Sequence, residues 1–209
     1  MTKVRFTGIG LAAAAALTLS ACGNGAGSGS AGPGRPIAAP SPSIAGATGT
    51  PDGVTTRADV FGPACPQLPP GSLDWMSSQP AATAVSGNSL LTELTAAIAA
   101  AKMDDTLNSP HGITVFAPAD PAFDTLGEAE STELARTLRY HVLGRRYDAK
   151  GLSTAGTATT LDTAGGPLKI EGFGETMTIN GAKILCGNIP TENATIFVID
   201  KLLTPGSAK

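Results

Sequence analysis

Apolar side chains recur at the spacing of an amphipathic helix in two segments of the chain. From Ser89 to Lys102, the apolar face consists of Leu90, Leu91, Leu94 and Ile98. From Glu130 to Leu143, the apolar stripe consists of Leu134, Leu138, His141 and Val142, and Gly144 follows as a stop signal. In the second segment the acids Glu130 and Glu133 precede the bases Arg136 and Arg139, as the helix dipole favours. Both segments are predicted helices.

Between these helices the pattern changes to a short apolar run. Residues 113–116 (Ile-Thr-Val-Phe) lie between Gly112 and Pro118, which predicts a buried strand. Asp120 and Pro121 then have the residue types of a helix N-cap and a first helical position. They predict a short helix that continues through Leu126.

Beyond Tyr147 the periodicity is that of β-structure. Short strand candidates separated by glycine-rich breaks are 157–161, 168–171, 177–179, 182–186 and 195–199. Asn180-Gly181 lies between two of them and predicts a hairpin, because both residues tolerate positive φ. Helices come first and strands later, so residues 60–209 are predicted to form one α+β domain without a parallel βαβ sheet.

The first 21 residues have the pattern of an export signal. Lys3 and Arg5 precede an uncharged apolar stretch from Phe6 to Leu19, which is too short for a stable membrane span. The stretch ends in Leu19-Ser20-Ala21-Cys22, which resembles the bacterial lipobox. Cys22 is therefore the predicted attachment site of a diacylglyceryl group, and its acyl chains (palmitate, for example) would anchor the protein. The alternative is an ordinary secretory signal with an incidental cysteine.

Residues 22–59 are rich in Gly, Pro, Ala, Ser and Thr and have almost no large apolar side chains. Such a segment cannot offset the entropy of ordering and is predicted to be a flexible, disordered tether. A coil from Cys22 to Cys65 would span about 35 Å on average, which would hold the domain away from a lipid surface.

Composition excludes two classes of partner. The chain carries a formal charge of −3, and removal of Lys3 and Arg5 with the signal makes it more acidic. Nucleic-acid binding and electrostatic docking on anionic lipid both require clustered basic residues. Neither function is expected, and membrane attachment is left to the lipid on Cys22.

The chain has three cysteines. If lipid modifies Cys22, then Cys65 and Cys186 remain in an oxidising compartment, where one disulfide is expected. In the chain-entropy model, closing so long a loop contributes at most about 4–5 kcal/mol. Two free buried thiols are the alternative. A metal site is not expected, since two cysteines and two distant histidines lack ligand spacing.

The chain offers little that resembles catalytic chemistry. Its two histidines are His111 and His141, and no Gly-x-Ser-x-Gly elbow is present. We therefore predict no enzyme activity and no cofactor. The neighbouring Asp104 and Asp105 are interpreted as a solvated loop or helix cap. Asn193-Ala194-Thr195 matches a glycosylation sequon but is interpreted as part of the turn that leads into a strand.

Several segments resemble the signatures of the fasciclin-like domain family. They are Thr114-Val115-Phe116-Ala117-Pro118-Ala119-Asp120-Pro121-Ala122-Phe123, then Tyr140-His141-Val142, and last Asn193-Ala194-Thr195-Ile196 through Asp200, Leu203 and Pro205, with Asp105-Thr106-Leu107 as a shorter piece upstream. Ala119 departs from the threonine usual in the family. The resemblance implies a wedge-shaped, two-sheet β sandwich flanked by helices, with a role in adhesion or extracellular recognition and without catalysis.

The combination of lipobox, tether and one such domain resembles the surface antigens of mycobacteria and other actinobacteria. It implies a protein anchored by lipid on the outer side of the membrane, or released from it, with an extracellular protein or matrix partner. A pocket that binds a small hydrophobic molecule and a structural role in the envelope are the alternatives. The resemblance also links Tyr140 and His141 to adhesion, whereas the helical spacing of His141 favours a buried, structural role for that residue.

Overall fold

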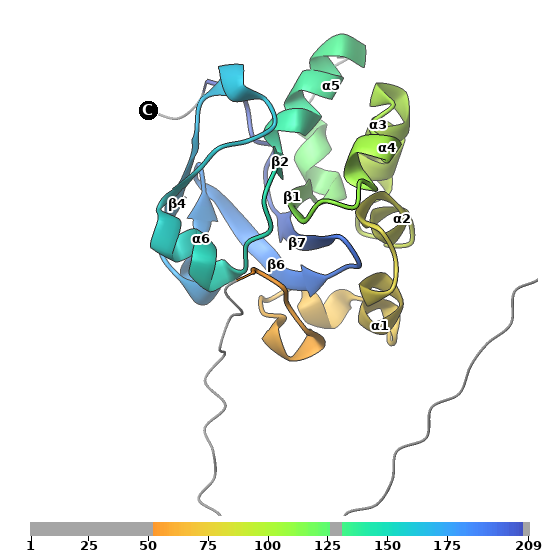
Figure 1. Ribbon diagram of the computed structural model, residues 1–209. Coiled ribbons are helices and arrows are strands. Elements are labelled where there is room, and N and C mark those ends of the chain that lie inside the picture. The colour runs from red at the N-terminus through yellow and green to blue at the C-terminus, as the bar shows by residue number, and fades with distance from the viewer. Residues whose placement is uncertain (1–51, 126–130, 207–209) are drawn as a thin grey trace, which may run out of the picture. The chain divides into compact units, whose positions relative to one another are not determined.

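The computed structural model describes residues 52–125 and 131–206 (Figure 1). The predicted signal, Cys22 and the tether as far as residue 51 lie outside this part of the chain. The helices are α1 (Ser72–Ser77), α2 (Ala81–Ser86), α3 (Thr92–Ala101), α4 (Asp104–Leu107), α5 (Ser131–Tyr140) and α6 (Ala149–Ala155), with 3-10 turns η1 (Arg57–Asp59), η2 (Cys65–Gln67), η3 (Asp120–Thr125), η4 (Thr163–Gly165) and η5 (Gly174–Thr176). None of the described helices is long and apolar enough to cross a membrane.

The strands form a seven-stranded sheet with the order β2-β1-β7-β6-β5-β4-β3. Their bounds are β1 (Ile113–Pro118), β2 (Val142–Leu143), β3 (Thr157–Ala158), β4 (Leu168–Glu171), β5 (Thr178–Ile179), β6 (Ala182–Pro190) and β7 (Ala194–Ile199). Neighbours are antiparallel except β1 and β7, which run parallel. An isolated bridge between Leu143 and Thr160 brings the two ends of the sheet together, although regular pairing does not close it.

Two apolar cores lie on opposite faces of the central strands. Phe116 of β1 and Phe197 of β7 point into a core enclosed by the curved sheet itself, where their ring centroids are 5.8 Å apart. Val115 and Ile196 point the other way, into a core covered by helices α1 to α5. Successive strand residues face opposite sides, and both sides are buried, so these strands are apolar throughout. The expected α+β wedge is present, and its two layers are parts of one curved sheet.

The predicted helix over 89–102 is present as α3, whereas the helix over 130–143 ends earlier than expected. The prediction that Gly144 ends it is wrong, because α5 stops at Tyr140 and Val142–Leu143 form β2. Val142 pairs with Val115 of β1, so its β-branched side chain is placed in the sheet. The contact with β1 is non-local, and the helical pattern of the sequence cannot show it.

Asp120 has a different role from the one predicted. It was expected to cap the helix that it begins, but its carboxylate caps α3 instead. Oδ1 accepts a hydrogen bond from the Glu93 amide at 2.9 Å, and Oδ2 accepts one from the Thr92 hydroxyl at 2.7 Å. The short helix that follows Asp120 is a 3-10 turn. The residue types of an N-cap were identified correctly, but they serve a helix that is near only in the folded chain.

The hairpin predicted at Asn180-Gly181 is present between β5 and β6. Both residues have positive φ, 47° and 80°, as the sharpest two-residue turns require. The strands predicted at 168–171 and 195–199 are β4 and β7, the latter one residue longer. Strand β6 extends four residues beyond its predicted end, through an irregular region where Asn188 has a φ of 57°.

The domain begins earlier in the chain than residue 60. Residues 53–68, here called the N-terminal strap, run across the end of the sheet. The Thr195 hydroxyl donates to the Gly53 carbonyl at 2.9 Å, and Thr55 is buried. Residues 53–59, which were assigned to the tether, therefore pack on the domain. They have the small and polar composition of a linker, and tertiary contact with β7 overrides it.

Candidate functional site

Tyr140, the last residue of α5, lies inside the core enclosed by the sheet. Its side chain is fully buried. The phenol oxygen accepts a hydrogen bond from the Asn180 side-chain amide at 3.1 Å, so the polar end of the ring is paired with the β5–β6 turn. The ring also fills the space beside Gly165, where a Cβ would lie 2.6 Å from it.

His141 is buried beside Tyr140, on the chain between α5 and β2, and both of its ring nitrogens are paired. Nδ1 lies 2.8 Å from the Thr137 carbonyl oxygen, and Nε2 accepts a hydrogen bond from the Leu203 amide at 2.9 Å. Nδ1 therefore carries the hydrogen, and the ring is neutral. Burial lowers the pKa of His141 from 6.5 to about 4, although the bond to Thr137 opposes this shift. The ring links α5 to the C-terminal segment.

This geometry assigns structural roles to the Tyr-His pair. The two side chains are 0% and 1% exposed, so a partner on the surface of the domain cannot touch either one. All hydrogen bonds of the His141 ring go to backbone groups, and none goes to a nucleophile. His111 is exposed. In the described ranges, no three His, Cys, Asp or Glu side chains gather as a metal site would require.

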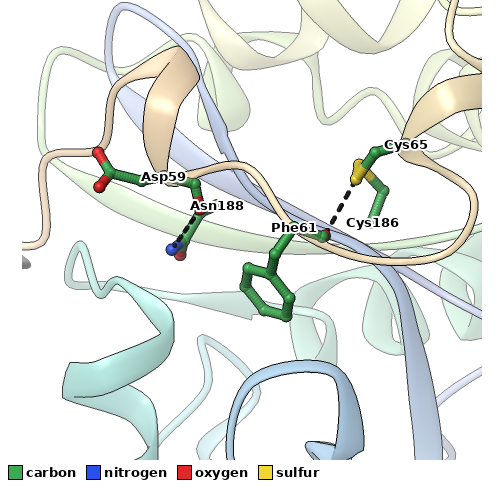
Figure 2. The surroundings of a disulfide bond; sticks show 5 residues. All are labelled: Asp59, Phe61, Cys65, Cys186 and Asn188. Carbon is green, nitrogen blue, oxygen red and sulfur yellow. Dashed lines mark hydrogen bonds between the residues drawn. A yellow bond between two sulfur atoms is a disulfide. The ribbon is translucent and has the colours of Figure 1, made fainter. Parts of the chain in front are cut away.

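Cys65 and Cys186 form the predicted disulfide, which joins the strap to β6 (Figure 2). The cysteines are 121 residues apart in the sequence, so the bond would add about 5 kcal/mol in the chain-entropy model. The Cys65 sulfur also lies 3.0 Å from the Phe61 carbonyl oxygen. Oxidised sulfur carries no hydrogen, so this is a packing contact. The disulfide thus fixes the strap where it crosses β6.

Hydrogen bonds also hold the strap on the N-terminal side of Cys65. Phe61 and Gly187 exchange two backbone bonds, at 3.2 and 2.7 Å. The Asn188 side-chain amide donates to the Asp59 carbonyl at 3.1 Å, and its oxygen accepts from the Ala149 amide at 2.8 Å. Asn188 therefore ties the strap, β6 and the start of α6 together. In Figure 2 the Phe61 ring points away from the disulfide, toward the side of α6.

Asn193 performs a similar function in the turn between β6 and β7. Its side-chain oxygen accepts from the Ala81 amide at 2.8 Å, and its nitrogen donates to the carbonyls of Leu107 and Ser109 at 2.7 and 2.6 Å. The residue is buried. A side chain held by three backbone partners is not accessible to a glycosyltransferase in the folded domain, so the sequon match reflects a structural asparagine at the turn before β7.

A groove of about 440 Å³ lies where the strap, the start of α6 and η5 meet. It is open to solvent. The apolar part of its lining comes from Ala58, Val60, Phe61, Ala149 and Phe173, and the remainder from Asp59, Asp148, Lys150, Ser153, Thr154, Gly174 and Asn188. Phe173 stands on a turn between two glycines of positive φ and is 77% exposed.

One part of this region was predictable from the sequence and another was not. Cys65 and Cys186 are together, and they fix one wall of the groove. The groove was not predicted, because three segments far apart in the chain form it. Gly172-Phe173-Gly174 was the available signal, since an aromatic residue between two glycines is typical of an exposed turn.

The family model of the Fasciclin domain matches residues 89–205 of this chain. Immunogenic protein MPB70 of Mycobacterium bovis is 34% identical over 190 aligned residues, covering 81% of this chain and 96% of that protein. Cell surface glycolipoprotein MPB83 of the same organism is 34% identical over 184 residues, covering 79% of this chain and 81% of that protein.

Among solved structures, the chain is similar to a FAS1 domain pair from the insect cell adhesion molecule Fasciclin I. The TM-score is 0.47 with 16% sequence identity, and the match covers 56% of this chain and 45% of that chain.

Proposed function

Because this chain belongs to the fasciclin domain family, we propose that it is a lipid-anchored surface protein whose domain recognises another protein outside the membrane. The observation that carries the proposal is the order of its parts: a leader that ends in Leu19-Ser20-Ala21-Cys22, a Gly- and Pro-rich stretch, and one fasciclin domain. The relative MPB83, which is named as a cell surface glycolipoprotein, supports the same location.

The interior of the domain favours recognition over catalysis. Tyr140 and His141 are buried in the core, so any contact with a partner must use other side chains. Trp75, on α1, is 42% exposed. Its ring covers Gly87, where a Cβ would lie 2.2 Å from it, so the ring has a fixed position. Asp74, the residue before Trp75, forms a salt bridge of 2.7 Å with Arg57 of the strap.

An exposed tryptophan beside an arginine is typical of protein-binding surfaces. Tryptophan and arginine are enriched among the residues that dominate binding energy at interfaces, and a ring that is already fixed loses little entropy on binding. We assign the partner contact to this α1 surface, defined by Arg57, Asp74 and Trp75. In Figure 1, α1 lies across the strap from α6. None of the three residues lines the groove.

The test is binding of the purified chain, without residues 1–22, to intact cells and to immobilised matrix proteins. We expect more binding than with an unrelated lipoprotein domain, and Trp75→Ser should weaken it about tenfold. Phe173→Ser is the matched control, since it also removes an exposed aromatic ring but leaves the α1 surface intact. Equal binding by the unrelated domain, or an equal loss in both variants, would contradict the proposal.

A further inference from the structure

The groove beside the strap has the size of a small-molecule site. Its volume of about 440 Å³ lies within the range of ligand pockets, roughly 300–1,000 Å³. Three structural elements form it, and its walls are fixed: the disulfide and the Phe61–Gly187 bridge hold the strap, and Asn188 holds the start of α6. A binding site that is formed in advance does not have to be ordered by its ligand.

Most of the polar side chains in the lining are already paired within the protein. The Ser153 and Thr154 hydroxyls donate to the carbonyls of Gly172 and Lys150, at 3.0 and 2.8 Å. The Asp148 carboxylate accepts from the Gly151 amide at 2.7 Å as the N-cap of α6. The side-chain amide of Asn188 donates to the Asp59 carbonyl and accepts from the Ala149 amide. A ligand in the groove therefore meets few groups that need a hydrogen-bond partner.

The charges around the groove do not favour an anion. Asp59 and Asp148 are negative and Lys150 is positive. The Asp59 carboxylate accepts from the backbone amide and the hydroxyl of Thr56, at 2.8 and 2.7 Å, within its own turn. With two acids against one base, a ligand carboxylate would find no net attraction. A ligand in the groove would therefore be held mainly by contact with apolar surface.

Phe173 supplies apolar surface that the protein itself leaves uncovered. It is the most exposed of the large hydrophobic residues that the structure describes, and it stands at the rim of the groove that the Phe61 ring also lines. An aromatic ring in water is unfavourable until something apolar covers it. A ligand that fills the groove would lie against both rings.

We propose that this groove binds an uncharged apolar molecule, with an aliphatic chain or aromatic ring lying between Phe61 and Phe173. The site is separate from the α1 surface, and the proposal does not depend on lipid attachment at Cys22. It adds ligand capture to recognition of a protein partner, and the two activities can be lost independently.

The test uses the neutral fluorescent probe N-phenyl-1-naphthylamine with the purified, disulfide-bonded chain. We expect a saturable rise in fluorescence that decanol reverses, and decanoate should compete less well than decanol because of the acidic lining. Phe173→Ser removes the rim ring and should weaken binding about tenfold. Ala58→Phe places a ring in the groove from an exposed position and should also weaken binding.

Trp75→Ser is the matched control, because it removes an exposed aromatic ring outside the groove and should bind the probe as the unaltered chain does. Circular dichroism establishes that each variant is folded. Absence of saturable binding, equal affinity in Phe173→Ser and the unaltered chain, or displacement by decanoate at least as effective as by decanol would each overturn the proposal.

Discussion

Replacing Asn193 by alanine should lower the free energy of unfolding by about 4 kcal/mol, because each buried backbone group left without a partner costs about 1–3 kcal/mol. Asn193→Ala leaves three such groups, the Ala81 amide and the carbonyls of Leu107 and Ser109. These groups belong to α2, to the end of α4 and to the loop before β1, so the loss would loosen the helical layer from the sheet. Urea unfolding, followed by circular dichroism, measures the effect.

Asn108→Ala is the matched control. Its side-chain oxygen accepts one hydrogen bond, from the Ala82 amide at 2.9 Å, and the residue is exposed. We expect a loss of about 1 kcal/mol. If the two asparagine variants unfolded at the same urea concentration, Asn193 would not have the structural role assigned to it.

Acidification should destabilise the domain through His141. Its pKa is about 4 when folded and 6.5 ordinarily, so the unfolded chain binds the proton more tightly. Stability is therefore complete above pH 6.5, falls as the pH decreases toward 4, and changes no further below that. At pH 5 the loss is about 2 kcal/mol relative to pH 7. Protonation of Nε2 would also break the bond from the Leu203 amide.

His141→Gln separates this effect from the titration of carboxylates. Melting temperatures of the variant and the unaltered chain are compared at pH 5 and pH 7. The melting temperature of the unaltered chain should fall more between pH 7 and pH 5 than that of the variant, whatever the absolute stability of the variant. The same decrease in both proteins would show that other groups cause the acid sensitivity.

Local patterns in the sequence were sufficient to predict the elements whose character is local. The apolar face of α3, the run that forms β1 and the turn at Asn180-Gly181 each depend on neighbouring residues, and each is present in the structure. The cysteine pair was predicted from chemistry, since two thiols in an oxidising compartment tend to join.

The elements that were missed depend on contacts between distant segments. Val142 and Leu143 continue the helical pattern of α5, but pairing with β1 places them in a strand. Asp120 caps a helix that precedes it by 27 residues, and residues 53–59 pack on β7 in spite of their linker composition. Such contacts leave no local periodicity in the sequence.

In the candidate sites, too, the features with a local signal were predicted and those that need distant segments to meet were not. The burial of His141 was anticipated from its place on an apolar stripe, although the helix that carries this stripe ends one residue before it. The groove required the strap, α6 and η5 to meet, and only the fold brings these segments together. The three backbone groups that bond to the Asn193 side chain could not be identified from the sequon that contains it.

The proposed function depends most on one claim, that Cys22 is the first residue of the mature protein and carries lipid. Mass spectrometry of the N-terminal peptide, isolated from the membranes of cells that produce the full chain, tests it most directly. We predict a peptide that begins at Cys22 and carries the mass of a diacylglyceryl group. A peptide in which Ala21 is still joined to an unmodified Cys22 would contradict the account.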